Sequence, residues 1–410
     1  MTRPSIPRYA NLTLFLGARL LATMAVQMIS VGVSWQVYAL TGNVLDLGWL
    51  GLAQFAPLIP LVLLAGHAAD RFSRQWIIAL CYGLELVCAL LLMAVSAVPQ
   101  ADVGMIFAVM ALHGSARAFL MPANQAVLRD LVLRDDFERA VALSSSTFQL
   151  GVIAGPAVGG LLYLGGPTTV YASAGSLLGI AIILISSTRP SRARPVSGPL
   201  SLERLLDGVR HVRSRPVILG AISLDLFAVL FGGASALLPA YANDVLGVGP
   251  AELGLLRTAM ALGAAGTGLL LAFKPITRRV GLSMFAGVAL FGTATLGLGL
   301  STDFRLSLLA LGLMGAGDMV GVYVRHTLIQ LDTPDAIRGR VSAVNSVFIG
   351  ASNELGEFES GLTAAWFGLV PAILIGGTAT LLVVGLWLWK FPALRSMDGF
   401  PREMARSPQT

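Results

Sequence analysis

Long apolar runs, separated by short polar gaps, recur along the whole chain. Each run is about 20 residues or longer, which suffices for a helix that crosses a hydrocarbon core of about 30 Å. Charged residues and prolines collect in the gaps between the runs. The pattern predicts twelve transmembrane helices, over residues 12–40, 44–65, 76–97, 103–122, 138–164, 168–188, 216–242, 251–273, 282–300, 306–325, 340–365 and 368–391.

The composition agrees with this pattern. Of the 410 residues, 55% are hydrophobic and 12% are charged, against roughly 25% charged residues in an ordinary soluble domain. The first apolar run is too long for the core of a signal peptide and lacks an A-x-A cleavage site, so we expect it to be retained as a helix. Cys81 and Cys88 lie in one apolar run and predict neither a disulfide framework nor a metal site. We therefore predict an all-α polytopic membrane protein without a soluble domain.

The basic residues predict the orientation. With twelve helices, both termini and every second gap lie on one side of the membrane, and 24 of the 28 Lys and Arg residues fall there. The opposite gaps hold only Arg305. Basic residues favour the cytoplasmic side, so we expect both termini in the cytoplasm and the protein in the cell inner membrane. The formal charge of +6 is then a topology signal, and we expect no nucleic-acid partner.

The longest gap, residues 189–215, divides the chain into two halves, 1–188 and 216–410. Its stretch SLERLLDGVRHV, residues 201–212, has an apolar helical face and a basic one, a pattern typical of a helix on an anionic membrane surface. This helix is either a plain linker or a lipid-sensing element.

The two halves contain matching positions. DLGWL at 46–50 matches ELGLL at 252–256, and Arg117 stands at a place equivalent to that of Asp318. We infer a duplication of six helices. Parallel six-helix repeats, with a binding site at mid-membrane between them, are typical of one large class of secondary transporters.

The stretch GHAADRFSRQ, residues 66–75, places charged residues in the short gap between two apolar runs. It resembles the loop between helices 2 and 3 of the major facilitator superfamily, G-x-x-x-D-R-x-G-R-[RK], with Gly66, Asp70, Arg71 and Arg74 matching. Ser73 and Gln75 depart from the pattern. The resemblance implies a gating latch, for which Arg129 is the expected partner of Asp70; the alternative is a simple cytoplasmic anchor.

GVIAGPAVGG, residues 151–160, is similar to the fifth-helix motif of the antiporters of this superfamily. The matching residues are Gly151, Gly155, Pro156, Gly159 and Gly160. Glycines every four residues form a smooth groove for close helix packing, and we expect it to face Gly263, Gly266 and Gly268. The motif favours an exporter, although it is also compatible with packing alone.

The wider chain resembles the enterobactin-exporter and drug-efflux branch of the superfamily, through LFLGARLLA near the start, LLPAYANDVLGVGPAELGLL at 238–256 and TLIQLDTPDAIRGRVSAVNS at 327–346. The resemblance implies the twelve-helix major facilitator fold of two six-helix bundles, with helices 1, 4, 7 and 10 lining the cavity. The candidate cavity residues are Arg19, Gln27, Trp35, His113, Arg117 and Arg257. The bases of the first half either bind substrate or form ion pairs with acids of the second.

Acidic residues inside apolar runs are the candidates for proton coupling, because charges within a membrane are costly and mark function. They are Glu354, Glu357, Asp225 and Asp318. Burial favours the protonated carboxyl group, so we expect some of them to carry a proton near neutral pH. Glu354 and Glu357 are the first candidates, and they either carry the proton or neutralise Arg257. For Glu85, on a helix expected at the periphery, we expect a structural role.

These features together predict a secondary active transporter, a proton-coupled exporter of a small amphipathic or anionic molecule such as a siderophore or drug. No phosphate-binding loop is present in the sequence, so we expect the proton gradient to drive it, without a cofactor or metal. We expect a monomer in the lipid bilayer that is not an enzyme. An importer or uniporter on the same fold, and a membrane sensor or scaffold, are the alternatives.

Overall fold

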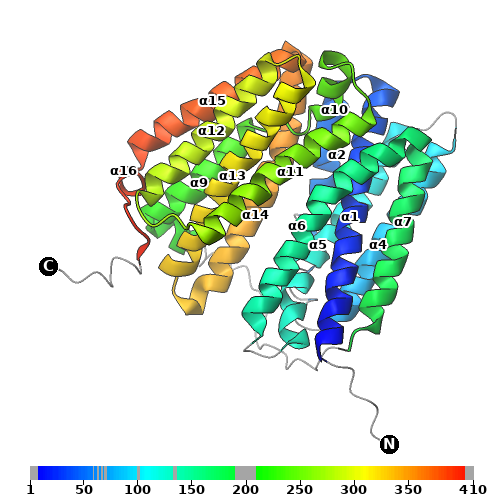
Figure 1. Ribbon diagram of the computed structural model, residues 1–410, viewed down its shortest axis with the longest axis horizontal. Coiled ribbons are helices and arrows are strands. Elements are labelled where there is room, and N and C mark those ends of the chain that lie inside the picture. The colour runs from blue at the N-terminus through cyan, green and yellow to red at the C-terminus, as the bar shows by residue number, and fades with distance from the viewer. Residues whose placement is uncertain are drawn as a thin grey trace, which may run out of the picture. The chain divides into compact units, whose positions relative to one another are not determined.

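Helices account for the regular structure of the described residues (Figure 1), which in this computed structural model are 8–401 except 59, 62–63, 66–67, 69–71, 99–101, 133–135 and 190–208. The first half contains α1 (Arg8–Thr41), α2 (Val44–Phe55), α4 (Arg74–Ser96), α5 (Val103–Leu131), α6 (Phe137–Leu162), the 3₁₀ turn η1 (Tyr163–Gly165) and α7 (Pro167–Ser187). The second half contains α9 (Pro216–Phe231), α10 (Leu238–Ala240), the π-helical turn η2 (Tyr241–Val245), α11 (Pro250–Phe273), α12 (Val280–Leu300), α13 (Phe304–Asp332), α14 (Asp335–Phe367), α15 (Leu369–Lys390) and α16 (Pro392–Arg395).

The all-α fold class is confirmed, and each predicted span overlaps one of these helices. Within the described ranges, nine helices are long and apolar enough to cross a membrane, and α2 and α9 are shorter apolar helices. Several predicted boundaries are wrong, among them that of the span predicted over 103–122, which continues to Leu131 in α5. The span predicted over 216–242 breaks after Phe231, where Gly232 and Gly233 have low helix propensity. The span predicted to end at residue 325 continues to Asp332.

Equivalent turns recur in the two halves, as expected from a duplication. Four glycines have positive φ in the described chain, and they form two pairs, Gly42 with Gly247 before α2 and α11, and Gly166 with Gly368 before α7 and α15. Glycine is favoured at such positions because it has no Cβ. Asp102 and Asp303 likewise cap the first turns of α5 and α13 by accepting backbone N–H bonds. The backbone conformation of these turns thus repeats between the two halves, although few side chains are identical at equivalent positions.

The chain forms two compact units. Unit 1 comprises residues 1–42, 52–200 and 248–258, and unit 2 comprises residues 43–51, 201–247 and 259–410. The start of α2 therefore belongs to unit 2, and the start of α11 belongs to unit 1, an exchange that the sequence pattern does not indicate. The predicted amphipathic stretch from 201 lies outside the described residues except for its end, from Val209 onwards.

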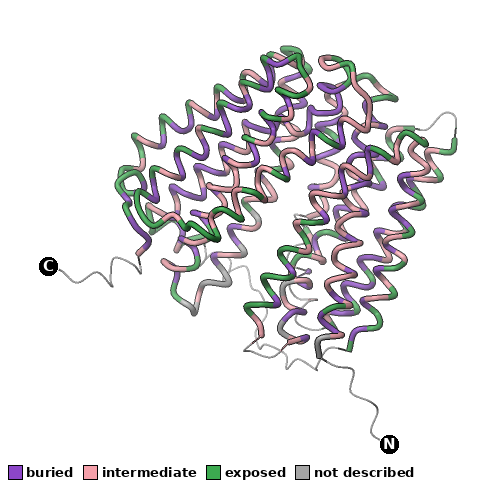
Figure 2. Tube along the Cα trace, in the orientation of Figure 1, coloured by how far each residue is buried: buried purple, intermediate pink, exposed green. Residues whose placement is uncertain are grey.

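Within unit 1, α1 packs along α6 and α7, and α4 packs along α5 and α7. Buried positions follow the sides on which these helices meet, whereas exposed positions follow their outer sides (Figure 2). The glycines of α6 lie at one such contact, where a Cβ on Gly155 or Gly159 would meet the backbone of α1 at Met24 or Met28. The predicted glycine groove therefore packs against α1.

The glycines of the eighth predicted span, which were expected to face this groove, belong to unit 2. Positions 263 and 268 pack against α13, and a Cβ on Gly266 would meet nothing within 4 Å. The contact of α6 with α11 is made instead by Gly160, which lies against Gly254. Small residues are required at each place because the backbones approach closely.

Replacing Gly159 by leucine should destabilise unit 1. A Cβ at Gly159 would lie 2.8 Å from Met28 Cα, where no side chain can give way, and overpacking of this kind costs about 1–3 kcal/mol. The matched control is Gly179→Leu on α7, where a Cβ would meet nothing within 4 Å. Thermal unfolding of the purified protein should show a lower midpoint for Gly159→Leu only. Equal midpoints for the two variants would contradict the packing described.

The core of unit 2 is closed by the C-terminal segment after α15. Leu394, Met397 and Phe400 are buried in a cluster with residues of α9, α12 and α13. Asp398 accepts the backbone N–H of Arg279 through its side chain at 3.0 Å and that of Val280 through its carbonyl oxygen at 3.1 Å. These bonds satisfy N–H groups that the first turn of α12 leaves free.

Candidate functional site

A buried ion pair joins two helices of unit 2. Asp225 on α9 pairs through Oδ2 with Nη1 of Arg325 on α13, and the two residues are 6% and 3% exposed. The sequence pattern ends a predicted span at Arg325, whereas α13 continues for seven residues beyond it, to Asp332. Arg325 thus neutralises the buried carboxylate of Asp225, for which an ion pair with a base of the first half was one of the two alternatives.

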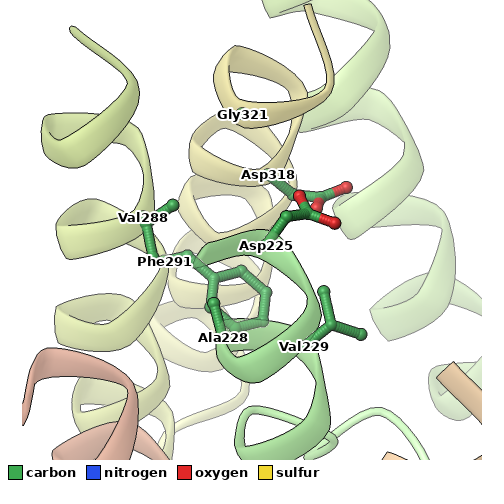
Figure 3. A pocket seen from close by; sticks show the side chains of 7 residues that line it. All are labelled: Asp225, Ala228, Val229, Val288, Phe291, Asp318 and Gly321. Carbon is green, nitrogen blue, oxygen red and sulfur yellow. The ribbon is translucent and has the colours of Figure 1, made fainter. Parts of the chain in front are cut away.

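A second carboxyl group lies beside this pair. Asp318 and Asp225 both line a cavity of about 10 Å³, and Figure 3 shows the two carboxyl groups on the same side of it. Gly321, one turn from Asp318, lies beside them, and a Cβ there would be in ordinary contact with Asp225 Oδ1 at 3.5 Å. Ala228, Val229, Val288 and Phe291 complete an otherwise apolar lining.

The size and charge of this cavity limit its chemistry. A volume of about 10 Å³ holds roughly one water molecule, so the cavity cannot contain an organic substrate. Arg325 compensates one of the two carboxylates, and Asp318 has no basic partner among the described residues. With both acids ionised the group has a net charge of −1, and one added proton makes it neutral. The arrangement is therefore suited to binding a single proton inside an apolar helix bundle.

Unit 1 contains a cation in different surroundings. Arg19 on α1 donates through Nη1 to Ser144 Oγ on α6 at 2.5 Å, and its guanidinium lies 5.3 Å from the ring centre of Phe148. Among the described residues, Arg19 has no carboxylate partner. A half-buried guanidinium held by a hydroxyl group and an aromatic ring can still accept an anion, since its other N–H groups remain available.

Three further cavity candidates also lie in unit 1. Gln27 on α1 lies beside Gly155 of α6, and Trp35 is half-buried. Arg257, near the start of α11, donates to Ser30 Oγ and Ser34 Oγ of α1 at 2.9 and 3.0 Å. One arginine and two serines thus hold the first turns of α11 to α1. The spacing of these residues in the sequence does not indicate that they meet.

His113 and Arg117 do not line one face together, although they are four residues apart on α5. Arg117 is exposed, whereas His113 is buried and its Nδ1 lies 2.5 Å from Glu85 Oε2 on α4. His113 therefore differs from the expectation of a cavity residue. Glu85 is completely buried, although α4 also has an exposed side that includes Leu80 and Leu91. Sequence reasoning could not pair these two residues, because it did not indicate how α4 and α5 are rotated against each other.

The acids of α14 lie in unit 2. Glu359 Oε1 accepts a bond from Thr363 Oγ1 at 2.8 Å, and Glu354 is half-buried. Glu357 packs against the start of α2, where a Cβ on Gly51 would come within 2.6 Å of its Oε2. Glu354 and Glu357 remain candidates for proton coupling.

Of the loop motif at 66–75, the structure describes only the end. Gly66, Asp70 and Arg71 lie outside the described residues, as does the side chain of Arg129. Arg74 donates through Nη1 to both carboxylate oxygens of Asp130 at 2.9 Å. Gln75, which replaces a basic residue of the motif, donates to three carbonyl oxygens at the end of α7, those of Ile185, Ser186 and Thr188. It thereby satisfies carbonyl groups at a helix C-terminus, where a basic residue is also favourable.

Comparison with known proteins identifies what this architecture is similar to. The family profile described as Major Facilitator Superfamily matches residues 15–356. The enterobactin exporter EntS of Shigella boydii is 26% identical over 388 residues, which cover 90% of each chain. The multidrug efflux pump Tap of Mycolicibacterium fortuitum is 28% identical over 414 residues, covering 94% of this chain and 97% of Tap.

Solved structures show the same fold. A bacterial homologue of the human lysosomal transporter Spinster, in an inward-facing and occupied conformation, superposes with a TM-score of 0.72 at 15% identity, covering 96% of this chain and 97% of the homologue.

Proposed function

The chain belongs to the major facilitator superfamily, and on that premise we propose that this secondary transporter is a proton-coupled exporter of a small anionic or amphipathic molecule, working by alternating access. As a multi-span membrane transporter it acts on a small-molecule substrate and is not an enzyme. The positive-inside pattern supports cytoplasmic termini.

The observation that carries proton coupling is the cavity between Asp225 and Asp318 in unit 2. It is too small for an organic substrate, at about 10 Å³, and its carboxyl groups exceed its single guanidinium by one charge. In this proposal one proton neutralises the group and is released when the carrier changes conformation, because an uncompensated charge is unfavourable inside the bundle. Glu354 and Glu357 are the alternative carriers of that proton.

Export is supported by two observations. Two similar proteins, EntS and Tap, are named as an exporter and an efflux pump, at low identity. The glycine motif of α6 that resembles the antiporters also makes a close helix contact in unit 1. An importer or uniporter uses the same fold, so the direction of transport needs a direct test.

Arg19 and Phe148 support an anionic substrate with an aromatic part. The guanidinium supplies the charge and the ring an apolar surface, and Arg19 has no carboxylate partner in the described chain. Siderophores of the catecholate type and acidic aromatic drugs have this chemistry. Lipophilic cations form the competing class, since the acids of unit 2 could attract them.

The test uses inside-out vesicles with an acid interior and a pH-sensitive dye. Adding enterobactin, an acidic aromatic drug or ethidium to the outside should release protons only with a transported compound. We expect release with the anionic compounds, lost in the Arg19→Ala variant. Uptake of a labelled compound without proton movement would indicate a uniporter. Accumulation by energised right-side-out vesicles would indicate an importer.

A further inference from the structure

The hydrogen bond between Arg19 and Ser144 in unit 1 determines which edge of the guanidinium a ligand can use. Arg19 Nη1 donates to Ser144 Oγ at 2.5 Å, and Ser144 is 1% exposed. The other two nitrogens, Nε and Nη2, form one edge of the planar group and make no hydrogen bond within the described chain. Two parallel N–H groups match the two oxygens of a carboxylate, and such a bidentate pair is stronger and more specific than a single hydrogen bond.

An aromatic ring lies beside the same guanidinium. Phe148 follows Ser144 by four residues on α6, which places the two side chains on one face of the helix. The guanidinium carbon of Arg19 is 5.3 Å from the centre of the Phe148 ring. Phe148 is 44% exposed, so part of its surface remains accessible. A second ring can pack against it in an offset or edge-to-face arrangement.

The guanidinium lies where the close packing of α1 on α6 ends. Further along both helices, a Cβ on Gly151 would come within 2.7 Å of Thr23 Cβ, and the glycines of α6 begin only there. Arg19 lies eleven residues after the start of α1, and Ser144 lies seven after the start of α6. On the predicted topology both helices begin on the cytoplasmic side. The guanidinium is therefore nearer to the side from which an exporter takes up its cargo.

We propose that Arg19 binds the carboxylate of an aromatic acid through both Nε and Nη2, with the ring of the acid against Phe148. Ser144 is the positioning residue, because it holds the guanidinium in the orientation that presents this edge. Without its hydroxyl group the arginine samples more orientations, which the ligand must restrict when it binds. The inference deepens the proposed function by naming aromatic carboxylates as a substrate class, and it rests on the anionic substrate proposed above.

The test measures binding to the purified protein in detergent, without transport, by NMR titration. Benzoate is compared with benzamide, which has the same shape without the charge, and with cyclohexanecarboxylate, which has the charge without the aromatic ring. The wild type should prefer benzoate to benzamide by about 10- to 100-fold, the range for hydrogen bonds to charged groups. It should prefer benzoate to cyclohexanecarboxylate by about 2- to 10-fold, the range for an aromatic pair.

Three variants separate the fork, the ring and the positioning contact. Arg19→Lys keeps the charge but not the planar fork, so it should bind benzoate at least about tenfold less tightly. Phe148→Leu should lose the preference for benzoate over cyclohexanecarboxylate. Ser144→Ala should weaken benzoate binding by about 2- to 10-fold, the range for one immobilised side chain. The matched control is Ser176→Ala on α7, whose hydroxyl group bonds to Ala172 of its own helix and which should bind as the wild type does.

A double variant distinguishes positioning from a structural role of Ser144. In the Arg19→Lys background, Ser144→Ala should cause no further loss of benzoate binding, because the fork that it orients is already absent. An equal loss in both backgrounds would overturn the role of Ser144.

The wild type alone can decide the site, even if Arg19→Lys does not fold. No saturable benzoate binding, or equal binding of benzoate and benzamide, would overturn the inference, as would wild-type affinity in a folded Arg19→Lys. The expected preferences without substrate-triggered proton release in vesicles would instead overturn proton-coupled export and leave the site assignment standing.

Discussion

Asp318→Asn is expected to abolish proton-driven export. Asparagine has almost the same shape as aspartate but cannot exchange a proton, and the carboxyl group it replaces has no basic partner among the described residues. The rate of uphill transport should fall by at least about 100-fold, the scale of losing a group that transfers protons. Exchange of labelled for unlabelled substrate needs no net proton movement and should continue. The measurement compares the two rates in the same proteoliposomes.

Substitutions of the two acids on α14 are the matched controls for Asp318→Asn. Glu354→Gln and Glu357→Gln remove one carboxylate each without changing the Asp225–Asp318 cavity, which neither residue lines. Both should retain substrate-triggered proton release. If either of them uncouples transport while Asp318→Asn still accumulates substrate, the proton site lies on α14 and the assignment to unit 2's cavity fails.

Arg325→Leu is expected to be the most destabilising single substitution of a charged residue in unit 2. It removes the partner of Asp225 and leaves a carboxylate that is 6% exposed. Breaking one side of a buried pair costs about 3–5 kcal/mol, whereas replacing both sides by neutral groups is often nearly neutral. The double variant Asp225→Asn/Arg325→Leu should therefore recover most of the lost stability. Thermal unfolding of the purified proteins measures both effects.

Arg305→Leu is the control, because Arg305 is exposed at the start of the same helix. Its unfolding midpoint should stay within the error of the wild type. If Arg325→Leu unfolds at the same temperature as this control, or if the double variant is less stable than Arg325→Leu, the ion pair does not contribute as described.

The fold could be predicted from the sequence because its determinants are local and repetitive. An apolar run long enough to span the bilayer must form a helix, since lipid offers no partner for backbone polar groups. The duplication was visible at a few side chains, and the glycines with positive φ, such as Gly42 and Gly247, repeat it in the backbone. Asp225 and Asp318 were recognisable from the same rule, because acids are rare in apolar runs.

The pairing of charged groups could not be predicted from the sequence. Which group Arg325 pairs with depends on where α13 ends, and a helix end is not marked when polar residues continue the helix beyond its apolar run. Likewise, spacing placed His113 and Arg117 on one face of a cavity, but helix rotation directs His113 to Glu85 and leaves Arg117 exposed.

By itself the sequence determined the class of protein, the approximate positions of its helices, and the residue types able to carry charge through them. The tertiary structure decided which charged groups form ion pairs. Among the described residues, it leaves Asp318 in unit 2 without a basic partner and Arg19 in unit 1 without a carboxylate partner. The physical reason is that the two effects depend on different parts of the chain. Hydrophobic transfer depends on the composition of a single segment, whereas the energy of a buried charge depends on atoms within a few ångströms that come from other segments of the chain.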